Sequence, residues 1–205
     1  MKRRAPAERA EALRRYGSLV ERYHDTLDLV SDVALTRWDE HVAEAEAYVD
    51  ALCRLSPVPS RVLDLGSGVG LPGVVVAAHL PELVLELVER RRKRAAFLRM
   101  AVAAVGSRAA HVRMGDAADL DGPPVDVVTA QAVARLSEVY RVTAHRHAER
   151  VVVVARKGPQ ARAEVQELEA EIATGATVLA ADARPGRGTL LVVRMQGGLT
   201  CRSSA

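Results

Sequence analysis

Three apolar runs of the sequence carry an acidic residue at or near their ends, where a strand of an open sheet would stop. Asp64 lies in LDLGSGVGLPG, residues 63–73, while Glu89 ends LVLELVE and Asp116 ends HVRMGD. In an open α/β sheet the ligand lies beyond the carboxyl ends of the strands, and the first strand–helix loop is the usual cradle. Glycines in that loop let a ligand approach the backbone closely. These residues therefore predict a cofactor site at one edge of a sheet.

The glycine-rich stretch matches two cofactor-binding patterns, depending on the residue at which the pattern begins. From Gly68 it reads G-x-G-x-x-G, the dinucleotide fingerprint, whereas from Leu63 it reads apolar-Asp-apolar-G-x-G-x-G, typical of S-adenosylmethionine (SAM) methyltransferases. A pyrophosphate is anionic and prefers a helix N-terminus without a carboxylate nearby, so Asp64 fits the dinucleotide pattern badly. The same carboxylate suits the ammonium and sulfonium groups of SAM, which it can orient directly or through water.

The other two acids are consistent with the same cofactor. Glu89 suits the ribose hydroxyl groups that both cofactors possess. Asp116 can accept a hydrogen bond from an adenine amino group, and the amide that follows it can meet a ring nitrogen. Acids on three successive strand ends therefore predict SAM rather than a nicotinamide cofactor.

Short β-branched runs alternate with alanine-rich helical runs from residue 61 onward. Near-continuous apolar strands between helices indicate a mostly parallel sheet that is covered on both faces. We expect an α/β, Rossmann-like class I methyltransferase fold with seven strands and an antiparallel edge strand, because the last two runs follow each other around residues 185–188. The expected strands are RVLDLG, LVLELVE, HVRMGD, VDVVTAQA, ERVVVVARK, ATVLAADA and GTLLVVRM, and the expected helices are LPGVVVAAHL, RRKRAAFLRMAVAAV, RLSEVYRVTAHRH and QARAEVQELEAEIATG.

The first 60 residues have a different pattern. Apolar residues recur there at helical spacing and predict two or three helices, which end at the proline-rich SPVPS of residues 56–60. We expect a helical cap at residues 1–60 and a SAM-binding methyltransferase domain at residues 61–205, folded as one structural unit.

Composition limits the location and the partners of the protein. No apolar run approaches 18 residues, and the basic N-terminus lacks the apolar core of a secretory signal, so we expect a cytoplasmic protein without a membrane segment. We also expect a monomer or a weak dimer. Cys53 and Cys201 lie far apart, and no spacing of Cys or His suggests a metal site. A net charge of +3 and a pI near 9.1 are mild evidence for a polyanionic partner.

The chain resembles the RsmG (GidB) family of bacterial SAM-dependent methyltransferases, which methylate guanine N7 in 16S ribosomal RNA. The resemblance is carried by VLDLGSGVGLPG, LVERRRKRAAFLR, VDVVTAQAVARL and VVVARKG in this order, and by TRWDEHV in the N-terminal segment. For the cofactor it implies a pocket of Asp64, Gly66, Ser67, Gly68, Gly70, Leu71, Pro72, Glu89, Arg90, Asp116, Ala117 and Gln131. For the methyl acceptor it implies His41, Gln131 and Lys157, to which we add the neighbouring acids Glu40 and Glu44.

Several positions depart from the family pattern, and two of them lose an arginine. Gln131 stands where the family has the arginine of Ser/Ala-Arg-Ala, and Glu40 stands where it has an arginine before His41. Contacts from Lys and Arg to phosphate dominate RNA affinity, so an acidic cap over the acceptor pocket would repel an RNA backbone. We therefore expect a repurposed enzyme that methylates a nitrogen of a small, heterocyclic or nitrogenous acceptor. The alternatives are 16S rRNA, favoured by the basic run at residues 90–94, and a catalytically inactive SAM- or RNA-binding module.

The acceptor decides which side chains take part in transfer. A ring nitrogen with a free lone pair needs no base, whereas an N–H or O–H acceptor needs one, for which His41, Glu40 and Glu44 are candidates. The amide of Gln131 both donates and accepts hydrogen bonds and so suits a heterocycle. Lys157 would position an acidic edge of the acceptor.

Overall fold

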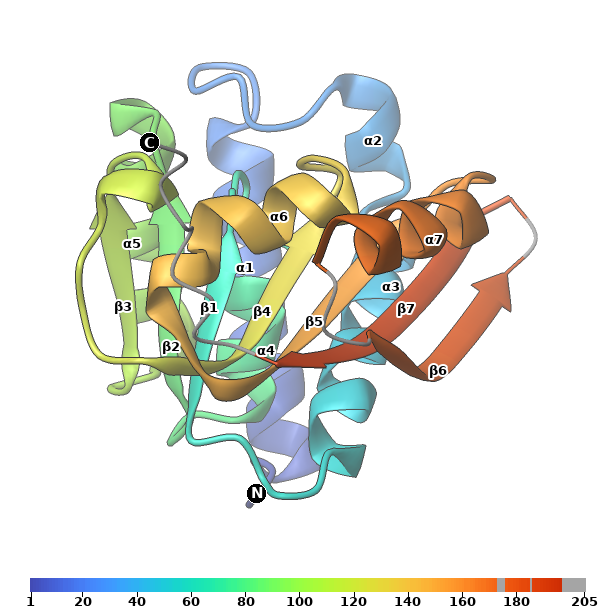
Figure 1. The fold of residues 1–205 in the computed structure, drawn as a ribbon. Helices are drawn as coiled ribbons and strands as arrows, with labels where there is room; N and C mark the ends of the chain where they lie inside the picture. Colours follow the sequence, from blue (N-terminus) through green and yellow to red (C-terminus); the bar gives the residue numbers. More distant parts are fainter. Residues whose placement is uncertain (173–175, 185, 197–205) are drawn as a thin grey trace.

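The computed structural model describes residues 1–172, 176–184 and 186–196, in which seven strands form one sheet. The order of the strands across the sheet is β3-β2-β1-β4-β5-β7-β6 (Figure 1). Their bounds are β1 Arg61–Leu65, β2 Val84–Glu89, β3 Ala110–Met114, β4 Val125–Gln131, β5 His147–Lys157, β6 Thr177–Arg184 and β7 Gly188–Gln196. Each of the seven expected strands is therefore present.

The sheet is mostly parallel, as expected, with one antiparallel strand. Strands β1 to β5 pair in parallel, whereas β7 runs antiparallel to both β5 and β6. The antiparallel strand therefore lies one place inside the edge, and β6 is the edge strand. The turn between β6 and β7 brings its residues to the same edge of the sheet as the carboxyl ends of β4 and β5.

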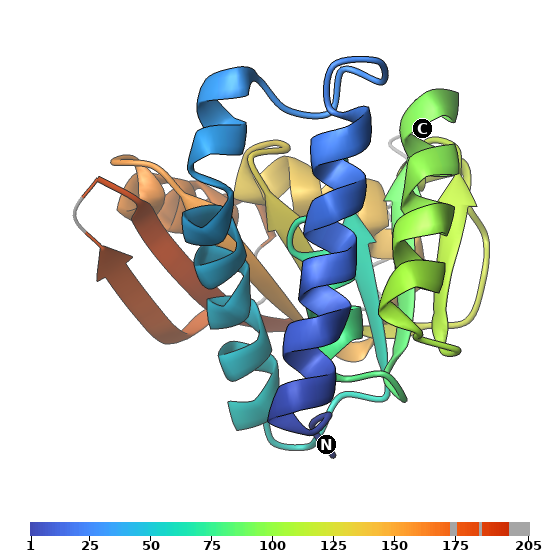
Figure 2. The same ribbon diagram turned by 180° about the vertical axis from the view of Figure 1, so that it is seen from behind.

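Helices cover both faces of the sheet. Figure 2 shows α1, α3 and α5 on one face, and Figure 1 shows α6 and α7 on the other. The α-helices are α1 Pro6–Tyr23, α2 Asp32–Thr36, α3 Trp38–Arg54, α4 Gly73–His79, α5 Arg92–Val105, α6 Leu136–Thr143 and α7 Ala161–Ile172. In these described ranges no helix combines the length and the apolar character that crossing a membrane requires.

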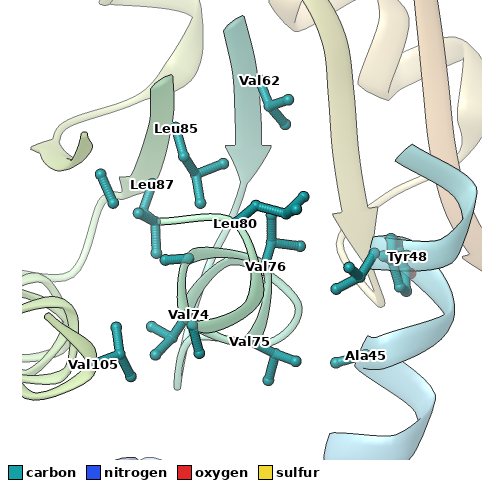
Figure 3. Packing of buried hydrophobic residues seen from close by; sticks show 14 of the residues in the cluster. Ala45, Tyr48, Val62, Val74, Val75, Val76, Leu80, Leu85, Leu87 and Val105 are labelled. Atoms are coloured by element: carbon teal, nitrogen blue, oxygen red, sulfur yellow. The ribbon is translucent and has the colours of Figure 1, made fainter. Parts of the chain in front are cut away.

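Alternation along each strand divides the core into two layers. Val62 of β1 belongs to the layer with α1, α3, α4 and α5, whereas Leu63 belongs to the layer with α6 and α7. Figure 3 shows Val74, Val75 and Val76 of α4 packed among the strands and neighbouring helices of the first layer. The N-terminal helices contribute buried side chains to that same layer. The division into residues 1–60 and 61–205 stays a prediction.

The largest deviation from the expected elements lies between β4 and β5. The helix predicted over residues 135–147 ends at Thr143, a 3₁₀ turn follows at Ala144–Arg146, and β5 begins at His147. Thr143 and His147 are both buried, and the Thr143 hydroxyl lies 2.8 Å from Nε2 of His147. Arg146 is buried as well. Among the other predictions, the final part of the last helix and Cys201 fall outside the described residues.

Candidate functional site

A cleft of ≈ 630 Å³ lies beyond the carboxyl ends of the central strands. The loops that follow β1, β2, β3 and β4 form its walls, and the N-terminal helices contribute Ala34 and His41. The predicted site residues that line the cleft are Gly66, Ser67, Gly68, Leu71, Glu89, Arg90, Asp116, Ala117, Gln131 and His41. The other predicted cofactor residues, Asp64, Gly70 and Pro72, are buried beneath this surface. The fold thus places the strand ends that were singled out from the sequence around one opening.

The loop after β1 is shaped by glycines whose backbone conformation other residues rarely adopt. Gly68 and Gly70 have φ angles of +56° and +112°. A Cβ at Gly70 would lie 2.5 Å from Cγ2 of Val74, so the protein itself leaves no room there. A Cβ at Gly68 would have its nearest protein atom at 3.7 Å, the carbonyl oxygen of Gly66. Gly68 therefore keeps the backbone accessible on the side of the cleft.

Tyr16 of α1 supports the glycine loop from below. Its side chain is fully buried, and its hydroxyl donates a hydrogen bond of 2.9 Å to the carbonyl oxygen of Val69. Its ring also meets Trp38 of α3 edge to face, with the ring centroids 5.3 Å apart. The N-terminal helices are therefore part of what fixes the shape of the cleft.

Glu89 connects the glycine loop to the start of α5. One carboxylate oxygen accepts a hydrogen bond of 3.0 Å from the Gly68 amide, and the other accepts one of 2.7 Å from the Arg91 amide. A carboxylate offers about four lone-pair sites, so two stay available for a ligand. This geometry suits the recognition of hydroxyl groups at the cleft.

Asp116 and Ala117 form the wall of the cleft after β3. The Asp116 carboxylate caps the short 3₁₀ turn Ala117–Asp119 by accepting a hydrogen bond of 3.1 Å from the Ala118 amide. Its side chain is exposed, whereas Ala117 is buried. One free oxygen of Asp116 can therefore still accept a hydrogen bond from a ligand.

Asp64 does not line the cleft, although the sequence suggested direct or water-mediated contact with the cofactor. It is fully buried, and Oδ1 accepts a hydrogen bond of 2.7 Å from the Thr129 hydroxyl. Oδ2 has no hydrogen-bond partner among the described residues, and a Cβ at Gly73 would approach it to 2.5 Å. Burial raises the pKa of Asp64 from 3.8 to about 6, although hydrogen bonds lower it in part. Asp64 packs beneath the glycine-rich loop, where burial makes its charged form unfavourable.

The raised pKa of Asp64 predicts how stability varies with pH. Between its ordinary pKa of 3.8 and about 6, the folded protein binds more protons at this site than the unfolded chain does. This contribution to stability is therefore complete below pH 3.8 and is lost as the pH rises through 6. In urea unfolding from pH 4 to 8, we expect Asp64→Asn to gain about 1–3 kcal/mol relative to wild type as the pH rises. A difference in unfolding free energy between Asp64→Asn and wild type that stays constant with pH would contradict the raised pKa of Asp64.

Gln131 and His41, which were predicted to contact the acceptor, both line the cleft. Gln131 ends β4, and its Oε1 is buried without a hydrogen-bond partner among the described residues. The following residue, Ala132, has a φ of +54°, which is unusual for a residue with a Cβ. His41 is half-buried on α3, with Nδ1 3.8 Å from Glu44. The structure therefore brings these two predicted residues to the same opening.

Lys157 does not present a free ammonium group to the cleft. Its side chain is 8% exposed and forms an ion pair of 2.9 Å with Glu164 of α7. The ammonium also donates a hydrogen bond to the carbonyl oxygen of Ala134. Because these partners hold the ammonium, Lys157 ties the loop after β4 to α7, which corrects the prediction that it positions the acceptor.

The acidic cap expected from the sequence is neutralised by arginines. Glu40 pairs with Arg37 at 2.7 Å and with Arg187 at 2.9 Å, and Arg187 also lies 3.4 Å from Glu44. The hydrogen bond from Arg37 keeps the pKa of Glu40 below its ordinary value. Glu40 and Glu44 do not line the cleft. Arg187, which was not among the predicted site residues, reaches α3 from the turn between β6 and β7.

The described residues fit the cofactor predicted from the sequence. Glycines leave the backbone open at Gly68, and Glu89 and Asp116 offer carboxylate oxygens to hydroxyl and amino groups at two neighbouring strand ends. Leu65, Val88 and Val133 add apolar surface between them. A nucleoside linked to an amino acid requires this combination of polar groups at its ends and apolar surface along its length.

The chain is similar to a family of ribosomal RNA methyltransferases. Residues 9–182 match the family described as GidB, rRNA small subunit methyltransferase G. The chain is 36% identical over 168 residues to ribosomal RNA small subunit methyltransferase G of Acidothermus cellulolyticus, which covers 82% of this chain and 71% of that protein. A protein of the same description from Rhizobium meliloti is 35% identical over 141 residues, covering 66% of this chain and 64% of that protein.

Solved structures with a similar fold include other methyltransferases. The ribosomal protein L11 methylase of Lactobacillus delbrueckii subsp. bulgaricus has a TM-score of 0.59 and 16% identity, over 77% of this chain and 79% of that one. The N-terminal domain of EvdMO1, solved in the presence of SAH and D-fucose, has a TM-score of 0.52 and 16% identity, over 77% of this chain and 82% of that one. At these identities the likeness concerns the fold alone.

Proposed function

The chain belongs to the family of rRNA small subunit methyltransferase G and is a SAM-dependent methyltransferase, and we propose that its acceptor is guanine N7 in small-subunit ribosomal RNA. This acceptor replaces the small nitrogenous acceptor expected from the sequence. The relatives carry the name of a ribosomal RNA methyltransferase, and the electrostatic reason for preferring a small acceptor does not hold.

The observation that carries this proposal is the charge around the cleft. The acids that should have repelled RNA are bound to Arg37 and Arg187. The cleft itself is lined by Arg90, Arg91 and Arg94, the last of which pairs with Asp28 at 3.5 Å. Cationic side chains around a cofactor cleft suit an acceptor that carries phosphates.

The chemistry of the proposed acceptor asks little of the protein beyond alignment. Bound SAM supplies an activated methyl group on a sulfonium. Guanine N7 has a free lone pair and no proton, so none of the residues His41, Glu40 and Glu44 has to act as a base. Gln131 can hold the planar base through its amide, and Glu89 and Asp116 hold the cofactor at the other side of the cleft. Fixing two reactants in line is by itself a large source of rate enhancement.

Methyl transfer from labelled SAM tests the proposal. Purified protein is incubated with small ribosomal subunits that lack the modification, and in parallel with a small-molecule extract. We expect label in the subunit RNA and 7-methylguanosine in its nucleoside digest. Label confined to the extract would support the small acceptor instead, and SAM binding without transfer to either would support the inactive binding module.

A further inference from the structure

A second hollow adjoins the cleft on the side of the acceptor. Gln131 and Ala132 line both the cleft and the hollow, so the two openings share a border at the end of β4. The hollow continues along the carboxyl end of β5 and the turn between β6 and β7. Its charged lining residues are all basic, namely Arg156, Lys157, Arg184 and Arg187. Lys157 and Arg184 pair with Glu164 and Asp182. A ligand that enters the cleft next to Gln131 therefore extends toward Arg156 and Arg187.

Arg156 carries charge that no acid balances. It stands beside Gln131 in the parallel register between β4 and β5. Its guanidinium donates hydrogen bonds to the carbonyl oxygens of Arg187 and Glu44, at 3.1 and 3.5 Å, and the described residues place no carboxylate within ion-pair distance of it. Its Nε is buried without an acceptor within the same part of the chain. A buried donor without an acceptor and a partly buried cation without a counter-ion are both costly, and an anionic ligand at the guanidinium would relieve the second cost.

Arg187 has an anionic partner that it can release. It bridges the β6–β7 turn to Glu40 and Glu44 of α3, and its side chain is 29% exposed. Glu40 is 43% exposed and keeps its ion pair with Arg37 when Arg187 leaves. Exposed ion pairs contribute little to stability, so a phosphate can replace Glu40 at small cost, whereas Glu44 is only 12% exposed.

We propose that Arg156 and Arg187 bind the RNA phosphate backbone beside the target nucleotide, and that Glu40 and Glu44 compete with that backbone for Arg187. This inference rests on the proposed function, because it needs an acceptor that continues past the reacting base. The two arginines then contribute affinity and register for RNA, whereas the cofactor site is independent of them.

The experiment compares three glutamine variants in binding to small ribosomal subunits. Subunit affinity is measured at several salt concentrations between 50 and 200 mM, roughly the range over which phosphate contacts weaken strongly. We expect Arg156→Gln and Arg187→Gln each to weaken binding by about 3- to 10-fold and to lower the salt slope by about 1. We expect Glu40→Gln to tighten binding, because it frees Arg187 and removes a negative charge. SAM affinity should not change in any of them.

The opposite changes in RNA affinity expected for Arg187→Gln and Glu40→Gln distinguish a phosphate contact from an ion pair that only stabilises the fold. Arg187→Gln and Glu40→Gln both break the same ion pair, so a structural role would weaken RNA binding in both, together with thermal stability. Arg150→Gln is the matched control, because Arg150 is an exposed arginine at the other end of β5. Equal weakening in the Arg187 and Glu40 variants, or wild-type affinity in both arginine variants, would overturn the inference. If wild-type protein neither binds nor methylates the subunit, the proposed function fails as well.

Discussion

Gly68→Ala is expected to lower SAM affinity by about 10- to 100-fold, which corresponds to roughly 1.4–2.7 kcal/mol of binding free energy. The reason is local. A methyl group at this position meets no protein atom closer than 3.7 Å, so it stands in the cleft, where the backbone must stay open to the cofactor. Calorimetric titration with SAM measures the effect, and thermal unfolding without ligand shows how much of it is due to the fold.

Two other glycines provide controls for this variant. Gly106 ends α5 with a φ of +66°, and a Cβ there would lie no closer than 3.9 Å to another residue. Gly106→Ala therefore carries a similar conformational cost, about 1 kcal/mol, far from the cleft. Gly70→Ala should instead destabilise the fold, because its Cβ would lie 2.5 Å from Val74. If Gly68→Ala loses only as much SAM affinity as Gly106→Ala, the loop does not cradle the cofactor at Gly68.

The elements of this fold could be predicted because each rests on a local signal. The valine-rich run before Lys157 and the glycine-rich run after Leu65 indicate a buried strand and a tight loop without reference to the rest of the chain. Positions at strand ends were predicted for the same reason, and Glu89 and Asp116 do line one cleft. The orientation of Asp64 was not accessible in this way, because it depends on Thr129, 65 residues later.

The charge balance around Glu40 and Glu44 could not be predicted, because it depends on contacts between distant parts of the chain. Glu40 and Arg187 are 147 residues apart and meet only after the β6–β7 turn has been placed against α3. Counting charges along the N-terminal segment therefore leaves out Arg187, which pairs with Glu40 and Glu44. The same holds for Lys157, whose ammonium pairs with Glu164 of α7, a helix that follows it in the chain.

One distant pair did leave a signal in the sequence, and it carries the largest expected effect on stability. Glu86 lies inside the apolar strand LVLELVE, where burying an unpaired charge would cost a large amount of free energy. In the fold it is buried and accepts hydrogen bonds of 3.0 and 3.1 Å from Nη2 of Arg146, which is 2% exposed. Arg146 also donates to the carbonyl oxygens of Leu120 and Pro123, so it fastens the segment before β4 to the sheet.

Arg146→Ala is expected to lower the free energy of unfolding by about 3–5 kcal/mol, because it leaves Glu86 buried with weaker partners and removes donors from two carbonyl groups. Arg113 is the matched control. It lies 3.6 Å from the same carboxylate but is 38% exposed, so Arg113→Ala should cost less than about 1 kcal/mol. Urea unfolding of both variants measures the difference.

Replacing the pair together, as Arg146→Met with Glu86→Leu, should recover part of the lost free energy of unfolding, since no buried charge is then left alone. If Arg146→Ala cost no more than Arg113→Ala, the buried ion pair would not be what secures this edge of the sheet.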